Sequence, residues 1–206
     1  YAYLKIAEGC SNCCTYCAIP LIRGPLRSRT VESCVAEARW LAGEGVKELI
    51  VVAQDITAFG ADRGKVEVAR LLDELNKVEG IAWIRLLYAY PERITDEFVA
   101  AMVRNDKVLH YLDVPIQHID SDVLRAMNRK GDEGTVRAAL EKACADEEVG
   151  LVLITDKLVA KCADTVFAYK LGRKRPLIVE MPDRHSDSNP GDSIRRYISE
   201  VVGVKI

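Results

Sequence analysis

Three cysteines near the start of the chain have a spacing that is typical of an iron–sulfur site. Cys10, Cys14 and Cys17 form a CxxxCxxC pattern, with the aromatic Tyr16 directly before the third cysteine. Thiolates are the usual ligands of such clusters, and three of them on one short loop can hold three corners of a four-iron cube and leave the fourth iron open. We therefore predict that these three cysteines bind a 4Fe-4S cluster whose open iron can bind a substrate.

Two other uses of the cysteines fit the sequence less well. The chain has an odd count of seven cysteines and no apolar secretion segment, which disfavours a disulfide framework. A zinc site stays open as an alternative, because Cys13 adds a fourth thiol to the loop and creates two abutting CxxC pairs. Structural zinc sites usually separate their pairs by a long spacer. The remaining cysteines have apolar neighbours in helical patterns and are predicted to be small core residues: Cys34, Cys144 and Cys162.

The composition is that of an ordinary globular protein. The chain has 206 residues, of which 49% are hydrophobic, enough for one large or two small domains. A net charge of −2 does not favour binding to nucleic acid, and no apolar run approaches the roughly 20 residues that a membrane span needs. We expect a soluble chain in the reducing cytoplasm.

Six short apolar runs alternate with helical patterns along the chain. The runs are residues 3–6, 48–53, 83–88, 111–116, 151–154 and 177–181. Nearly continuous apolar runs are typical of parallel strands that are buried on both faces. Their alternation with helices predicts an α/β fold with one continuous six-stranded parallel sheet, open or curled into a barrel. The cysteine loop would then leave the carboxyl end of the first strand, where α/β enzymes build their sites.

Residues 1 to about 137 resemble the radical S-adenosylmethionine core of a methylthiotransferase, of the type that modifies an aspartate of a ribosomal protein. Five separate matches in the expected order carry this resemblance. They are the cysteine motif itself, Ile19-Pro20 with the segment 23–29, Val52-Ala53-Gln54-Asp55, Tyr88-Ala89-Tyr90-Pro91 and Pro115-Ile116-Gln117-His118. The resemblance implies a partial barrel that would use all six apolar runs.

The same resemblance implies a cofactor and its binding residues. In that family the open iron chelates S-adenosylmethionine, an electron from the cluster cleaves it to a 5′-deoxyadenosyl radical, and the protein orients the cofactor. By position, the residues expected to contact S-adenosylmethionine or the cluster are Tyr16, Gln54, Asp55 and Gln117. The alternatives are ordinary packing for Tyr16 and a polar loop cap for Gln54 and Asp55. A ribosomal-protein substrate is implied by the family alone.

From about residue 139 to 206 the sequence resembles a different protein. Glu148–Leu151, 176–185 and 192–197 are similar to the latter part of a V/A-type ATPase central-stalk protein, the F component, which is a small flavodoxin-like α/β protein. The glycine-rich stretch that helps methylthiotransferases to hold S-adenosylmethionine is missing here. We therefore divide the chain into radical S-adenosylmethionine-like βα units, residues 1–138, and a flavodoxin-like βαβα segment, residues 139–206, which is expected to continue the same sheet.

Two families that meet inside a helical pattern, without a Pro/Gly/Ser spacer, indicate recombined βα units, that is, a chimera. The first hypothesis is an iron–sulfur-binding radical S-adenosylmethionine core without full methylthiotransferase turnover. The second is an engineered α/β scaffold without activity. A weaker third is a component of an ATPase central stalk.

Overall fold

The computed structural model describes residues 1–115, 117, 118, 120–132, 134, 138, 151–155, 159, 163–172 and 177–181. The chain forms two compact units, residues 1–148 and 149–206. Within the described residues, none of the helices is long and apolar enough to cross a membrane.

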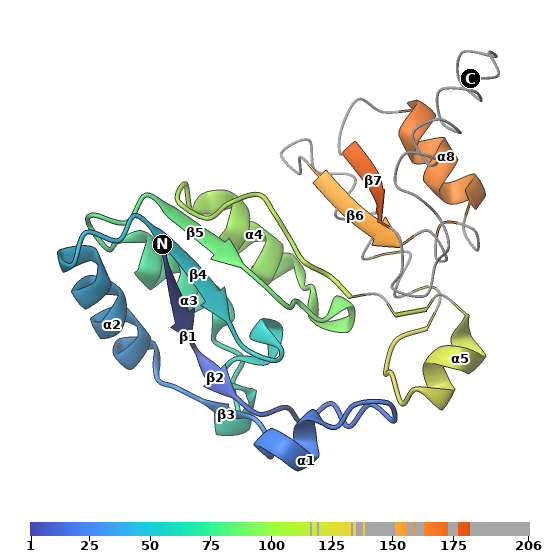
Figure 1. The fold of residues 1–206 in the computed structure, drawn as a ribbon, viewed down its shortest axis with the longest axis horizontal. Helices are drawn as coiled ribbons and strands as arrows, with labels where there is room; N and C mark the ends of the chain where they lie inside the picture. Colours follow the sequence, from blue (N-terminus) through green and yellow to red (C-terminus); the bar gives the residue numbers. More distant parts are fainter. Residues whose placement is uncertain are drawn as a thin grey trace. The chain divides into compact units, whose positions relative to one another are not determined.

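The core of the first unit is a three-stranded parallel sheet. Strands β1 (Ala2–Lys5), β4 (Glu48–Val52) and β5 (Trp83–Leu86) lie in the order β1-β4-β5 (Figure 1). Leu4 pairs with Val51, and Leu49 pairs with Ile84, so the apolar side chains of neighbouring strands lie level with one another. The first three apolar runs of the sequence therefore form parallel strands, as predicted.

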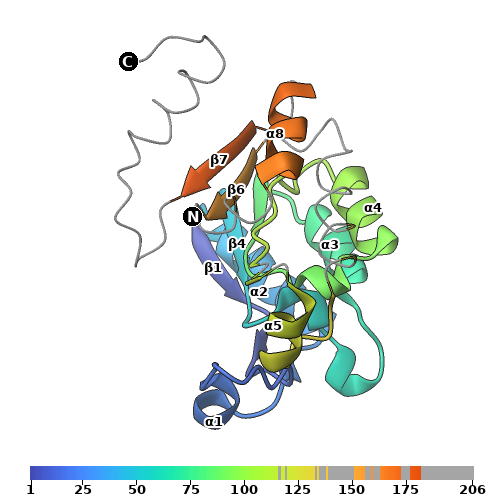
Figure 2. The ribbon, with the colours of Figure 1, turned by 90° about the vertical axis from the view of Figure 1, so that its right-hand side faces the viewer.

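Three amphipathic helices cover one face of this sheet: α2 (Val31–Gly43), α3 (Val68–Asn76) and α4 (Asp96–Arg104) (Figure 1 and Figure 2). Thr30 and Thr95 begin α2 and α4 as side-chain caps, each accepting a backbone hydrogen bond from the first turn. The helices bury apolar residues at spacings of three and four, including Leu71, Leu75 and Phe98. Burial of such side chains is worth about 1.5 to 3 kcal/mol each before entropy is subtracted.

Short elements follow the carboxyl ends of the strands. Strands β2 (Ala7–Glu8) and β3 (Arg27–Ser28) pair antiparallel, and the chain between them contains the cysteine loop and α1 (Ile19–Arg23). The 3₁₀ turns η1 (Ile56–Ala58) and η2 (Ala61–Arg63) follow β4, η3 (Pro91–Arg93) follows β5, and α5 (Ser121–Ala126) comes later in the chain. These segments carry the polar groups of the candidate site.

The predicted fourth strand is not formed in the described residues 111–115. The chain beside β5 makes one isolated bridge, Ile84 with Val108, and a single backbone bond from Ala89 to the carbonyl of Asp113. Tyr88 has a left-handed φ of 68°, and its N–H donates to the Asp113 carboxylate, 3.2 Å away. A regular ladder cannot continue through a residue in that conformation. Ile116 lies outside the described residues.

The second unit contains strands β6 (Leu151–Thr155) and β7 (Leu177–Met181) and helix α8 (Ala163–Gly172). The two strands are parallel, with Leu151 opposite Leu177. In the part of the chain that the structure describes, β6 and β7 form a sheet of their own, so the predicted continuous six-stranded sheet and the partial barrel are not observed. Because most of the connecting and terminal segments lie outside the described residues, the rest of the predicted βαβα segment stays a prediction.

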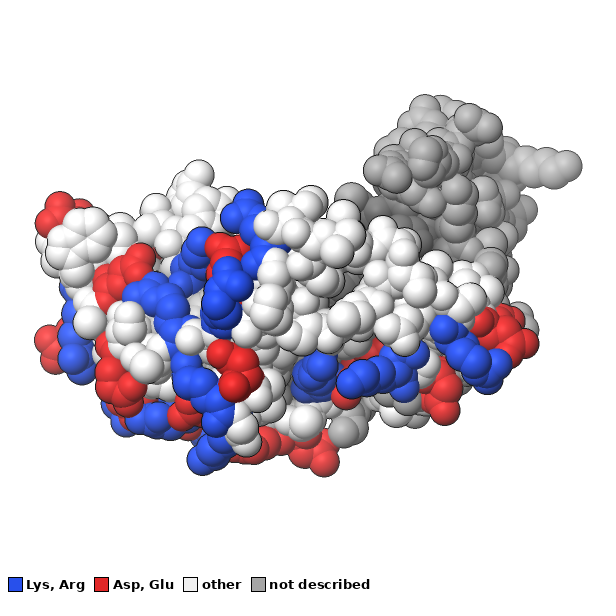
Figure 3. Space-filling model, turned by 90° about the horizontal axis from the view of Figure 1, so that it is seen from below, with Lys and Arg blue, Asp and Glu red and all other residues white. Residues whose placement is uncertain are grey.

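The surface carries both signs of charge. Basic and acidic side chains are interspersed over the face seen in Figure 3. Many of them form ion pairs, such as those of Arg70 with Glu32 and with Glu67. This pattern agrees with the near-neutral composition and contains no large basic area among the described residues of that face.

Candidate iron–sulfur and cofactor site

The cysteine loop begins at a position that only glycine can fill. Gly9 has a φ of 76°, and a Cβ on it would lie 2.2 Å from the Pro25 carbonyl oxygen. This close approach lets the next residue, Cys10, donate its N–H to the Gly24 carbonyl at 3.1 Å. Ser11 Oγ accepts the Leu26 N–H at 3.1 Å. The first cysteine is therefore fixed against the segment that leads into β3.

The far end of the loop is held by residues at the end of α5. The Thr15 N–H donates to the Met127 carbonyl at 3.1 Å, and Thr15 Oγ1 donates to the Ala126 carbonyl at 3.0 Å. Asn128 Nδ2 donates to the Cys13 carbonyl at 2.8 Å. Thr15 and Ala126 are 111 positions apart in the chain. The end of α5 therefore supports the loop although it is distant in sequence.

The thiols differ in their exposure. Cys10, Cys14 and Cys17 are half-buried, whereas Cys13 is exposed and has a left-handed φ of 52°. The Cys17 N–H donates to the Cys14 carbonyl at 3.0 Å, which forms a tight turn between these two cysteines. Burial, and secondarily the Asp55 charge, raises the pKa of the Cys10 thiol.

Within the described residues, no three His, Cys, Asp or Glu side chains converge closely enough to hold a single metal ion. A tetrahedral zinc site would need its sulfurs at about 2.3 Å from one point. The thiolates of a four-iron cube bind different corners and lie farther apart. The choice between a cluster and a zinc ion at these cysteines stays a prediction.

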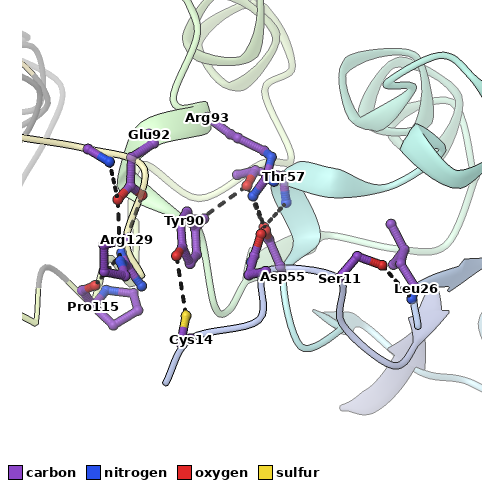
Figure 4. Close-up of polar contacts among 12 residues, drawn as sticks. Ser11, Cys14, Leu26, Asp55, Thr57, Tyr90, Glu92, Arg93, Pro115 and Arg129 are labelled. Atoms are coloured by element: carbon purple, nitrogen blue, oxygen red, sulfur yellow. Dashed lines mark hydrogen bonds and ion pairs between the residues drawn. The ribbon is translucent and has the colours of Figure 1, made fainter. Parts of the chain in front are cut away.

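The buried carboxylate of Asp55, just after β4, connects the end of that strand to the cysteine loop. Asp55 is 2% exposed and accepts hydrogen bonds from Asn12 Nδ2 at 3.0 Å and from Arg93 Nη1 at 2.7 Å (Figure 4). Its other oxygen accepts the Thr57 N–H at 3.0 Å and also the Thr57 hydroxyl. Both oxygens of Asp55 are thus occupied within the protein, and its predicted contact with S-adenosylmethionine stays a prediction.

Gln54 differs from its neighbour. Its Oε1 is buried and has no hydrogen-bond partner among the described residues. A buried acceptor without a partner costs free energy unless a ligand or water supplies the donor. Gln54 therefore differs from Asp55, both of whose carboxylate oxygens accept hydrogen bonds within the protein.

The other two predicted cofactor residues are exposed. Tyr16 is 52% exposed, and its pKa is raised first by partial burial and then by the nearby Cys14. Gln117 is exposed and has a left-handed φ of 68°. Both side chains are accessible to a ligand, and their roles stay predictions.

A recess open to solvent lies beside the loop. Among its lining residues are Cys10, Asn12, Asp55, Asp62 and Arg93. It therefore brings together Cys10, the first cysteine of the motif, and Asp55, but Tyr16, Gln54 and Gln117 are not part of its lining.

A second polar network was not anticipated from sequence. Tyr90 Oη lies 3.4 Å from Cys14 Sγ, and the Arg129 guanidinium lies 3.7 Å from the centre of the Tyr90 ring (Figure 4). Arg129 in turn forms two hydrogen bonds of 3.3 Å with the Glu92 carboxylate. Tyr90 belongs to one of the five motifs, but the contact with Arg129 joins distant segments and has no signal in one sequence.

Two family models match the chain. Residues 4–147 match the family model of the Radical SAM superfamily, which is most of the chain. The chain therefore belongs to the radical S-adenosylmethionine (SAM) superfamily. A second family model, the ATP synthase (F/14-kDa) subunit, matches residues 99–198 and overlaps the first.

Two similar proteins from different organisms have the same name. The chain is 56% identical over 142 residues to the ribosomal protein uS12 methylthiotransferase RimO of Alkaliphilus oremlandii, covering 68% of this chain and 32% of that protein. It is 50% identical over 160 residues to the protein of the same name from Acetivibrio thermocellus, covering 77% of this chain and 35% of the relative. The chain thus spans about a third of the length of these relatives.

A solved structure shares the fold at low identity. The radical S-adenosylmethionine methyltransferase TsrM from Kitasatospora setae, solved with cobalamin and a 4Fe-4S cluster, superposes with a TM-score of 0.62 at 15% identity. The match covers 88% of this chain and 34% of TsrM. At that identity the likeness concerns the fold alone.

Proposed function

We propose that residues 1–138 are a radical SAM core in which Cys10, Cys14 and Cys17 bind a 4Fe-4S cluster and the open iron binds SAM. The observation that carries the proposal is the anchoring of the cysteine loop at both ends. The bonds of Cys10 to Gly24 and of Thr15 to Met127 hold the loop next to the recess. A preformed loop lowers the entropy cost of binding a cluster.

The donor set fits this cofactor pair. Three thiols on one loop suit the soft iron ions of a cluster. Gln54 Oε1, buried and without a partner among the described residues, can accept a hydrogen bond from an amino group such as that of SAM. When bound, the cluster supplies one electron to the sulfonium of SAM. The protein's own part is to hold the loop through the hydrogen bond between Asn12 and Asp55.

The substrate class follows from the relatives. Their names describe methylthiotransferases of the ribosomal protein uS12, and we propose the same descent for residues 1–138. In the methylthiotransferase family, methylthio transfer also draws on a second cluster that is bound by a separate domain. We do not expect methylthio transfer by these 206 residues alone, because the cysteines outside the loop do not form a second closely spaced motif: Cys34, Cys144 and Cys162.

We also propose that residues 139–206 descend from a flavodoxin-like ATPase stalk protein, so that the chain is a chimera. The match of residues 99–198 to the ATP synthase family model supports this, as does the parallel β6–β7 pair with its intervening helix α8. This observation favours a second candidate function, an α/β scaffold in which cleavage of SAM has been lost. A stalk component is the third candidate, supported by the same match.

The experiment that separates the candidates is reductive cleavage of SAM. The full chain is reconstituted anaerobically with iron and sulfide and treated with dithionite and SAM, and 5′-deoxyadenosine is quantified by chromatography. We expect 5′-deoxyadenosine from the parent and from Cys13→Ala, and none from Cys17→Ala. A parent that holds a cluster but yields no 5′-deoxyadenosine at any SAM concentration would support the scaffold instead.

A further inference from the structure

Tyr90 lies between a cluster cysteine and a buried ion pair. It is 8% exposed, and its Oη is 3.4 Å from Cys14 Sγ. Either atom can donate when the thiol is protonated. A thiolate bound to iron carries no proton, so in the loaded site the Tyr90 hydroxyl must be the donor.

The ring of Tyr90 is held in place from several directions. The Arg129 guanidinium lies 3.7 Å from the ring centre, and that of Arg93 lies 5.2 Å away. The Tyr90 N–H also bonds to Thr57 Oγ1 at 3.4 Å. A rotation that moved the hydroxyl away from Cys14 would therefore disturb the contacts of the ring with Arg129 and Arg93.

Arg129 is fixed as firmly as the ring. Its side chain is 2% exposed and that of Glu92 is 9% exposed, and two hydrogen bonds of 3.3 Å join the two groups. Arg129 also donates to the Pro115 carbonyl at 3.3 Å. A cation against the face of a phenol ring draws electron density from it and makes the hydroxyl a stronger donor.

A hydrogen bond to a ligating sulfur acts on the electron affinity of a cluster. Reduction adds one electron and one negative charge, part of which resides on the thiolates. A donor that faces a thiolate stabilises the reduced form more than the oxidised form and so raises the reduction potential. The electron comes from an external one-electron reductant, and the proton stays on the Tyr90 oxygen.

We propose that Tyr90 is a positioning residue that donates a hydrogen bond to the Cys14 thiolate and raises the reduction potential of the cluster, with Arg129 strengthening the donor. This inference rests on the proposed function, because it requires a cluster on Cys14. It adds a residue that makes the cluster easier to reduce and is itself neither a ligand nor a SAM contact.

The test is a redox titration of the reconstituted full chain, followed by the paramagnetic signal of the reduced cluster. In Tyr90→Phe, we expect the ratio of reduced to oxidised cluster at a fixed potential to fall about tenfold, equal to a shift of about 59 mV to lower potential for a one-electron couple. Tyr111→Phe is the matched control. Tyr111 is partly buried, and its ring centre lies 5.7 Å from the guanidinium carbon of Arg85. Its potential should equal that of the parent.

The outcomes separate the inference from the proposed function. A parent that binds no cluster overturns both. A parent with a cluster, together with equal potentials for the parent and Tyr90→Phe, overturns the inference alone. If Tyr90→Phe holds no cluster, the reduction potential of Arg129→Lys is measured instead. This variant keeps the positive charge but loses the planar contact with the Tyr90 ring. A downward shift of its reduction potential smaller than about 59 mV supports the inference, and a potential equal to that of the parent overturns it.

Discussion

Asn12 Nδ2 donates to Asp55 Oδ2 at 3.0 Å, and both side chains are buried although they lie 43 positions apart in the chain. This bond joins the cysteine loop to the carboxyl end of β4. Arg93 Nη1 donates to the same oxygen at 2.7 Å, which connects the segment after β5 to the same carboxylate. Three segments that carry the family motifs are therefore held together by one carboxylate.

Removal of that carboxylate should destabilise the fold. In Asp55→Ala, Asn12 and Arg93 lose their shared acceptor, and the cost of breaking a largely buried pair is about 3 kcal/mol in free energy of unfolding. Urea unfolding of the cluster-free chain measures it. Asp106→Ala, at an exposed aspartate, is the control and should change stability by no more than about 0.5 kcal/mol. Equal losses in the two variants would show that the Asp55 network contributes nothing.

Replacement of Gln54 should not destabilise the fold. Its buried Oε1 has no partner among the described residues, so Gln54→Leu removes an unsatisfied acceptor and should leave the stability of the cluster-free chain unchanged or slightly raised. Affinity of the reconstituted chain for SAM, measured by equilibrium dialysis, should fall by about tenfold, the equivalent of one hydrogen bond to a charged donor. Unchanged affinity would remove Gln54 from the cofactor site.

The contact between α3 and α4 should make stability depend on pH. Hydrogen bonds from Arg104, and then from Asn105, hold the pKa of Asp73 below its ordinary value of 3.8. A lowered pKa in the folded state means that the contribution is complete above the unfolded pKa and is lost as pH falls through the folded pKa.

The melting temperature of the parent should therefore fall more steeply than that of Asp73→Asn between about pH 5 and pH 2. Since the Asp73 side chain is 34% exposed, solvent screens part of the effect. Parallel melting curves for the two proteins across this range would contradict the assignment.

The thiols should differ sharply in reactivity. Burial raises the pKa of Cys34 to about 11, so its thiol is neutral and enclosed at about pH 8. Cys13 is exposed on the loop. In the cluster-free chain, iodoacetamide should modify Cys13 at least about tenfold faster than Cys34, as measured by peptide mass spectrometry. Comparable rates at the two positions would mean that the core around Cys34 opens readily.

The sequence predicted the parts of the fold that depend on local pattern. The apolar runs before Ile6, Ala53 and Tyr88 are strands, and spacings of three and four place the helices between them. The run at 111–116 has a similar composition, yet the left-handed Tyr88 and the Asp113 side chain interrupt the pairing of its described residues 111–115 with β5. Such a backbone conformation at a tyrosine leaves no mark in apolar periodicity.

The site was predictable to a similar extent. The spacing of Cys10, Cys14 and Cys17 indicates the cluster because the ligands lie on one short loop. The contacts of Tyr90 with Arg129 and of Asn12 with Asp55 bring together residues from distant segments, and only the folded chain determines which polar groups meet. Gln54 and Asp55 were predicted to lie near the site because they follow a strand. That position did not show that Gln54 Oε1 lacks a partner among the described residues while both oxygens of Asp55 are occupied.

Iron and acid-labile sulfide analysis after anaerobic reconstitution tests the central claim most directly. We expect about four iron and four sulfide ions per chain in the parent and in Cys13→Ala, and loss of both in the alanine variants of Cys10, Cys14 and Cys17. If Cys14→Ala retains as much iron and sulfide as the parent, or if the parent binds zinc in place of a cluster, the assignment of these three cysteines as cluster ligands is wrong.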